Sequence, residues 1–127
     1  MLAVAAQLLV MTLDIGPNLN AEVVRNRHSL CETIAMSSSI LASRGDLKGL
    51  EANLERVVSH NPDVLSAGVR RYDGVLFVDI NDHAGTWIPP EKIKSQQSQI
   101  YVPIQADGQE WGAVELRFRD LNGWSFR

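Results

Sequence analysis

The sequence predicts an α+β fold in which a long N-terminal helix and a second helix pack on a four- to five-stranded antiparallel sheet. Two amphipathic helical segments, residues 19–43 and 46–60, come first. Two short β-hairpins follow, with the pairs Asp73-Gly74 and Asp107-Gly108 at their turns. Asp-Gly between alternating apolar residues is a strong hairpin signal, because a type I′ turn needs positive φ at both central positions.

The first helix is expected to begin after Pro17-Asn18, with Asn18 or Asn20 as its N-cap. A helix of about 25 residues is about 37 Å long, more than a sheet of this size covers. Part of its face is therefore expected to pack against the same helix of a second copy, which predicts a homodimer. Small residues at heptad-like spacing allow a sheet or a helix to approach closely: Cys31, Ala35, Ser38 and Ala42.

Gly45 is expected to end this helix, Asp46 to cap the second one, and Asn61-Pro62 to stop it. The apolar period then changes to two, which predicts strands over residues 65–70 and 75–80. A final pair of strands is expected over 100–104 and 111–118, with Pro103 on an edge strand or at a bulge. Residues 81–98 have few apolar side chains and predict a long loop, which in small domains is usually functional or mobile.

Composition excludes several classes of protein. The 127 residues suit one domain, and the net charge of −3 without a basic stripe argues against nucleic-acid binding. The single cysteine, Cys31, excludes an intrachain disulfide and is expected to be a small core residue. No Cys/His spacing is typical of a zinc site.

Residues 1–13 are apolar and uncharged, but a bilayer span takes about 20 residues and a signal peptide has a basic start. They fit the outer end of a truncated transmembrane helix, a buried or dimer-packed helix, or an accidental apolar stretch. The first is favoured because the segment from Asp14 to Asn18 breaks the apolar run. We therefore expect residues 1–18 to be the end of a transmembrane segment or an N-terminal extension.

Residues 121–127 end in Trp124 and Phe126 beside Arg127, which suits the interface of a second membrane segment. They are expected to begin an exit linker to that segment. The domain itself is expected to span residues 19–120.

The stretch from Asn61 to Gly74, NPDVLSAGVRRYDG, is similar to NPDVLSAAVRRADG of periplasmic sensor domains in bacterial membrane-bound signalling proteins. Val102-Pro103-Ile104 and residues 111–118 resemble the last two strands of those domains, VPI and WG.VELRF. The resemblance covers residues 21–118 and indicates the PAS-like extracytoplasmic type called PDC or Cache. The amino-acid signature of double-module Cache domains is not found, and the length suits a single module.

The resemblance implies an extracytoplasmic sensing domain that feeds a histidine kinase or a diguanylate cyclase. It would be the periplasmic part of a bacterial inner-membrane protein and would transmit ligand or environmental state through its helical stem. Two alternatives remain open. One is a periplasmic protein-interaction module without a small ligand, and the other is a cytosolic PAS-like ligand-binding domain.

In PAS-like folds the ligand lies between the sheet and the loop that crosses it, which by resemblance is residues 82–94. Aromatic walls and a few polar groups are what an organic-ligand pocket needs. Each candidate also has a structural alternative: Trp87 pins the loop to the sheet, Tyr72 flanks a turn, and Arg70 faces solvent. The candidate ligand-binding residues are Arg70, Tyr72, His83, Trp87 and Tyr101.

Metal binding and catalysis are not expected. Asp79, Asn81, Asp82 and His83 resemble an EF-hand loop, but the sixth position is Ala84 and the nearest glutamate comes one residue late. An Asx-rich turn is the favoured interpretation. The sequence has no GxSxG, no HExxH and no Gly-rich phosphate loop, so we expect no catalytic residues, no cofactor and no enzyme activity in this chain.

Overall fold

The computed structural model describes residues 15–92 and 98–120, with the side chains of residues 21–92 and 98–120. The interpretations of residues 1–13 as a membrane segment and of residues 121–127 as an exit linker fall outside the described residues. Within those residues, no helix has both the length and the apolar character that a bilayer crossing requires.

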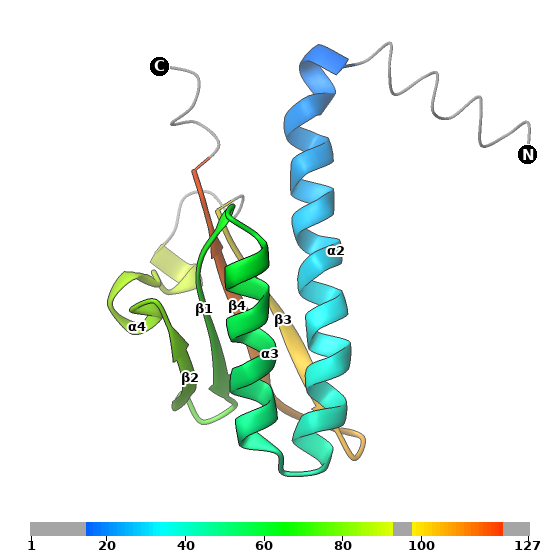
Figure 1. Cartoon of the computed structure of the whole chain (residues 1–127), viewed down its shortest axis with the longest axis vertical. Helices are drawn as coiled ribbons and strands as arrows, with labels where there is room; N and C mark the ends of the chain where they lie inside the picture. The colour runs from blue at the N-terminus through cyan, green and yellow to red at the C-terminus, as the bar shows by residue number, and fades with distance from the viewer. Residues whose placement is uncertain (1–14, 93–97, 121–127) are drawn as a thin grey trace, which may run out of the picture.

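Two helices cover one face of a four-stranded antiparallel sheet (Figure 1). The strands lie in the order β2-β1-β4-β3, with α2 against β3 and β4 and α3 against β1 and β2. This confirms the α+β class, the antiparallel sheet and the long N-terminal helix. The elements are α2 (Ile15–Ser43), α3 (Leu47–His60), β1 (Val64–Arg71), β2 (Leu76–Ile80), α4 (His83–Thr86), the 3-10 helix η1 (Pro90–Lys92), β3 (Gln99–Ala106) and β4 (Gln109–Phe118).

The core lies between the helices and the sheet face that they cover, which we call the helix face. Cys31, Ala35, Ser38 and Ala42 are all buried there, so the small residues of α2 allow a close approach to the sheet. Burial, followed by the nearby charge of Glu32, raises the pKa of the Cys31 thiol to about 12. The buried apolar residues are Cys31, Ile34, Ala35, Ala42, Leu50, Leu54, Val64, Ala67, Val69, Val78, Ile100, Ile104, Val114, Leu116 and Phe118.

Helix α2 begins at Ile15, four residues before the predicted start, so the expected break at Pro17-Asn18 was wrong. The physical reason is the position of Pro17 in the first helical turn. The backbone N–H groups of that turn have no partner inside a helix, so a residue without an N–H loses no hydrogen bond there.

The connection between the two helices follows the sequence signals. Gly45 has φ 69°, the amide of Gly45 donates to the carbonyl of Ala42, and the amide of Asp46 donates to that of Leu41. These bonds form a Schellman motif, in which glycine tolerates the left-handed conformation. The Asp46 side chain then accepts from the amide of Gly49 and caps α3, which ends at His60 as predicted.

Both predicted hairpins form, with different turns. Asp107 and Gly108 have φ of 54° and 78°, as a type I′ turn requires. At the first hairpin only Gly74 has positive φ, and its amide donates to the carbonyl of Arg71. This is a type I turn followed by a left-handed glycine, so the type I′ expectation was wrong there. The three-residue loop is accompanied by a register shift between Val69 and Arg70.

The region predicted as a long loop is partly helical, since it contains α4 and η1. Residues 81–92, which we call the crossing segment, leave β2 and run to η1. Strand β3 pairs only with β4, so Pro103 lies on an edge strand, as one of the two predicted options.

Candidate functional site

The sheet face opposite the helices, which we call the outer face, carries polar side chains that are nevertheless buried. On β1, Ala67 and Val69 point into the core, so the intervening residues Ser66 and Gly68 face the other way. Both are buried, because His83 of α4 packs on them. A Cβ atom on Gly68 would lie 2.7 Å from Cδ2 of His83, so only glycine leaves room for the imidazole.

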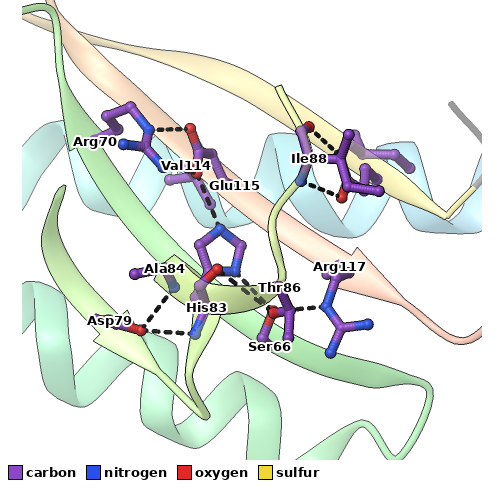
Figure 2. A network of polar contacts seen from close by, with 12 residues as sticks. Ser66, Arg70, Asp79, His83, Ala84, Thr86, Ile88, Val114, Glu115 and Arg117 are labelled. Atoms are coloured by element: carbon purple, nitrogen blue, oxygen red, sulfur yellow. Dashed lines mark hydrogen bonds and ion pairs between the residues drawn. The ribbon is translucent and has the colours of Figure 1, made fainter. Parts of the chain in front are cut away.

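His83 has no exposed surface and uses both ring nitrogens (Figure 2). Its Nε2 lies 2.9 Å from Oε1 of Glu115, and its Nδ1 lies 2.7 Å from Oγ of Ser66. A carboxylate only accepts, so Nε2–H donates to Glu115 and a neutral ring accepts the Ser66 proton at Nδ1. Arg117 Nε donates to the same Ser66 Oγ over 3.2 Å, which satisfies the hydroxyl on both sides.

Glu115 is the centre of this network. It is 5% exposed and pairs with Arg70, whose Nε donates to Oε2 at 2.8 Å and whose Nη2 donates to Oε1 at 3.2 Å. Burial alone would raise the pKa of Glu115. Hydrogen bonds from His83 and Arg70, together with the charge of Arg70, outweigh burial and hold the pKa of Glu115 below its ordinary value.

Three further contacts hold the crossing segment on the outer face. Asp79 Oδ1 accepts from the amides of His83 and Ala84, at 2.7 and 3.3 Å, and so caps α4 (Figure 2). The side-chain amide of Gln99 on β3 pairs with both backbone groups of Ile88, at 2.9 and 2.7 Å. The centre of the Trp87 ring lies 5.0 Å from that of His83, so the indole packs on the imidazole.

The chain enters this segment through two consecutive non-glycine residues in the left-handed region. Asn81 has φ 61° and Asp82 has φ 55°. Asn and Asp tolerate this conformation better than other residues, but it persists only where the surroundings hold it. The Asx-rich turn that the sequence favoured over a cation site therefore forms a tight bend that starts α4.

A pocket of about 270 Å³ opens beside the Arg70–Glu115 pair, between the sheet and η1. Tyr72 and Tyr101 are 72% and 52% exposed. Arg71, which also lines the pocket, donates to the carbonyl of Trp111 and lies over the Trp111 ring at 4.4 Å. The lining residues are Arg70, Arg71, Tyr72, Pro90, Tyr101, Glu110, Gly112, Ala113 and Glu115.

The structure brings three of the five predicted binding residues to this pocket: Arg70, Tyr72 and Tyr101. The other two do not line it. His83 is buried below Trp87 and its polar atoms are bonded inside the protein, so it has no group free to meet a ligand. Trp87 packs on His83, a residue of the same crossing segment.

Sequence analysis missed Glu115, Ser66 and Gln99. In the last strand Glu115 alternates with the apolar residues Val114 and Leu116, which is typical of an exposed position. The resemblance implied that residues 82–94 cross the sheet, but no residue pattern showed that they would bury this side chain. A buried glutamate becomes recognisable only once its partners, Arg70 and His83, are placed beside it.

The network contains a serine, a histidine and a glutamate bonded in series, Ser66, His83 and Glu115, which are the side-chain types of some hydrolase triads. Here Ser66 has no exposed surface, and its Oγ is engaged by both His83 and Arg117. A substrate carbonyl cannot approach this hydroxyl in the described conformation. In this conformation the three side chains form a closed hydrogen-bonded network with Arg117.

A second polar cluster joins α2 to the sheet at the end of the molecule where β1 begins and β4 ends. Arg27 is 3% exposed and donates to Asp63 through Nε and Nη2, at 3.1 and 2.7 Å. It also donates to the carbonyl of Arg119 over 2.9 Å and lies 4.7 Å from the centre of the Phe118 ring. We call this cluster the Arg27 clamp.

In the described part of the chain, no three His, Cys, Asp or Glu side chains are placed to hold a metal ion together. Comparisons of the chain with protein-family models, with curated proteins and with solved structures found no match. Function is therefore inferred from the arrangement of these residues.

Proposed function

We propose that this chain is a signal-sensing input domain whose sensing site is the pocket on the outer face. One observation carries the proposal: the crossing segment covers the outer face and leaves a pocket of about 270 Å³ beside the buried Arg70–Glu115 pair. This is just under the range of about 300–1,000 Å³ for pockets of drug-sized ligands. The expected occupant is a small metabolite held between Tyr72, Tyr101 and Arg70.

The order of elements supports a PAS-like domain of the PDC or single-Cache type. An N-terminal helix and a second helix cover one face, the first strand lies inside the sheet, and the segment after the second strand crosses the other face. The resemblance of residues 61–74, 102–104 and 111–118 supports a periplasmic location within this proposal. The output of the domain would be a membrane-bound histidine kinase or diguanylate cyclase.

The route of the signal in this proposal is α2 and the end of β4. The 29 residues of α2 span about 43 Å, while the ten residues of β4 span about 33 Å. Figure 1 shows the first turns of α2 projecting beyond the sheet. A displacement at the sheet can therefore be passed to a projecting helix.

A homodimer through α2 belongs to the same proposal. Met36 and Ile40 are one helical turn apart and are 72% and 57% exposed. Large apolar side chains on one exposed helix face are typical of a helix that packs against a partner.

Thermal unfolding of the purified chain in the presence of a metabolite library tests the sensing site. A ligand at about 100 times its Kd stabilises the folded state by about 2.7 kcal/mol, which raises the Tm by several degrees. We expect Tyr101→Ala to remove the shift, while Val75→Ala, an exposed residue outside the pocket lining, keeps it. No active compound, or equal shifts in both variants, would contradict the sensing site.

The gene on either side of the segment tests the membrane proposal. An apolar span of about 20 residues on each side, followed by an output domain, is the expected arrangement. Polar flanks on both sides would contradict the periplasmic location and favour the cytosolic alternative.

A periplasmic interaction module is the second candidate, favoured by an exposed aromatic cluster. Tyr72, Val75 and Phe77 are all at least 44% exposed, and the rings of Tyr72 and Phe77 lie 5.5 and 5.4 Å from the Arg71 guanidinium. Aromatic residues with arginine are enriched at protein interfaces. A partner protein whose binding is lost in Phe77→Asp, together with an unsuccessful ligand screen, would favour this candidate.

A further inference from the structure

We propose that Glu115 couples the pocket to the crossing segment, so that the state of Arg70 in the pocket controls how firmly His83 anchors residues 83–88. The inference deepens the proposed function, because the pocket is the proposed sensing site. It concerns what an occupant would change in the protein.

Glu115 belongs both to the lining of the pocket and to the polar network that holds His83. It lines the pocket, and its Oε1 is shared by Arg70 Nη2 and His83 Nε2, at 3.2 and 2.9 Å. Arg70 is the more accessible partner, with 32% of its side chain exposed against 7% for Glu115. An occupant of the pocket therefore meets the guanidinium before it meets the buried carboxylate.

Arg70 fixes the orientation of the Glu115 carboxylate. Two parallel N–H donors, Nε and Nη2, hold both oxygens of Glu115 in one plane. A guanidinium has five N–H groups, and Glu115 uses the edge formed by Nε and Nη2. An occupant that accepts hydrogen bonds from this edge displaces Glu115. The carboxylate is then free to turn toward the pocket and away from His83.

His83 is the central anchor of the crossing segment. It is the fully buried residue of α4, and Trp87 packs on its ring. Its other partner, Ser66, already accepts from Arg117, so Ser66 alone cannot replace the bond to Glu115. The left-handed Asn81 and Asp82 would favour a change of path once this anchor weakens.

Hydrogen exchange in a double-mutant cycle tests the coupling without any ligand. The reporters are the amides of His83, Ala84, Trp87 and Ile88, each bonded within the outer face or the crossing segment. We expect Arg70→Gln to speed their exchange about tenfold, since directly coupled sites interact on that scale. In a Glu115→Gln background, Arg70→Gln should change the exchange rate of these amides less than about twofold.

Arg71→Gln is the matched control. It removes a cation from the same pocket, but Arg71 donates to the Trp111 carbonyl and lies over the Trp111 ring, whereas Arg70 pairs with Glu115. Amides of β4 serve as the internal reference for global unfolding, which would speed exchange everywhere.

Unchanged or slower exchange in Arg70→Gln overturns the coupling. An equal increase in both backgrounds, or an equal effect of Arg71→Gln, also overturns it. These outcomes are independent of the ligand screen. A failed screen leaves the exchange result standing, and a failed cycle leaves ligand binding standing.

Discussion

At the scale of single residues, Glu115 has the strongest effect on the chemistry of the outer face. It is a buried carboxylate that keeps its charge because Arg70 and His83 donate to it. Its folded-state pKa is lower than in an unfolded chain, so its contribution to stability is present above the ordinary glutamate pKa of about 4.3. That contribution is lost as the pH falls through the lowered pKa of the folded state.

Glu115→Gln is therefore expected to reduce the free energy of unfolding by about 2 kcal/mol at neutral pH, the scale of hydrogen bonds to a charged group. The difference from the unsubstituted chain should shrink steadily as the pH falls below about 4.3. Urea unfolding of both proteins between neutral and acid pH measures it. A difference that does not change with pH would show that the glutamate charge is not what stabilises this site.

Gly68 allows a close approach that a larger residue would prevent. A Cβ atom at this position would lie 2.7 Å from the His83 ring and 2.9 Å from the Val78 carbonyl oxygen. We expect Gly68→Ala to destabilise the domain by about 1–3 kcal/mol, the usual effect of overpacking. Denaturant titration followed by Trp fluorescence measures this, and a change below about 0.5 kcal/mol would contradict the close packing of His83 on β1.

At the scale of elements, the Arg27 clamp fastens α2 to both the start of β1 and the end of β4. Replacing Arg27 with Met leaves Asp63 without its main partner, so we expect a loss of about 2 kcal/mol in the free energy of unfolding. Chemical denaturation measures it.

The control for this change is Arg25→Met, on the same helix. Arg25 is 64% exposed and pairs with Glu22, so the expected change is below about 0.5 kcal/mol. Equal losses in the two variants would show that the clamp contributes no more than a surface ion pair.

The elements that could be predicted from sequence are those whose signals are local. Gly45 and Asp46 fix the connection between the helices with their own backbone and side chain, and Asp107-Gly108 forms the expected turn. The Asp73-Gly74 pair shows the limit. It adopts another turn, and the pairing of β1 with β2 shifts its register between Val69 and Arg70.

The site was only partly predictable because burial of the outer face depends on a segment with no apolar pattern. The crossing segment is held by polar anchors: Asp79 at the helix start, His83 in the middle and Gln99 from a distant strand. Such anchors show no periodicity in the sequence. Two aromatic residues, Tyr72 beside a turn and Tyr101 in a predicted strand, could be proposed for the pocket, while Glu115 could not.

At the scale of the whole molecule, dimer formation through α2 is the main open prediction. We expect the chain to sediment as a dimer at high concentration and the double variant Met36→Lys, Ile40→Lys to sediment as a monomer. Leu47→Lys, an exposed apolar residue of α3, is the control and should remain dimeric. A monomeric parent chain, or a double variant that still dimerises, would contradict packing through this face.

The burial of Cys31 also provides a natural probe of how often the core of the domain opens. Thiol reagents attack the thiolate, and in the native state this sulfur is both enclosed and protonated at neutral pH. Modification in native buffer should therefore proceed only through molecules that have opened around the core, so its rate reports their population. A cysteine introduced on the surface could be labelled first, which permits spectroscopic probes to be attached without removing the natural one.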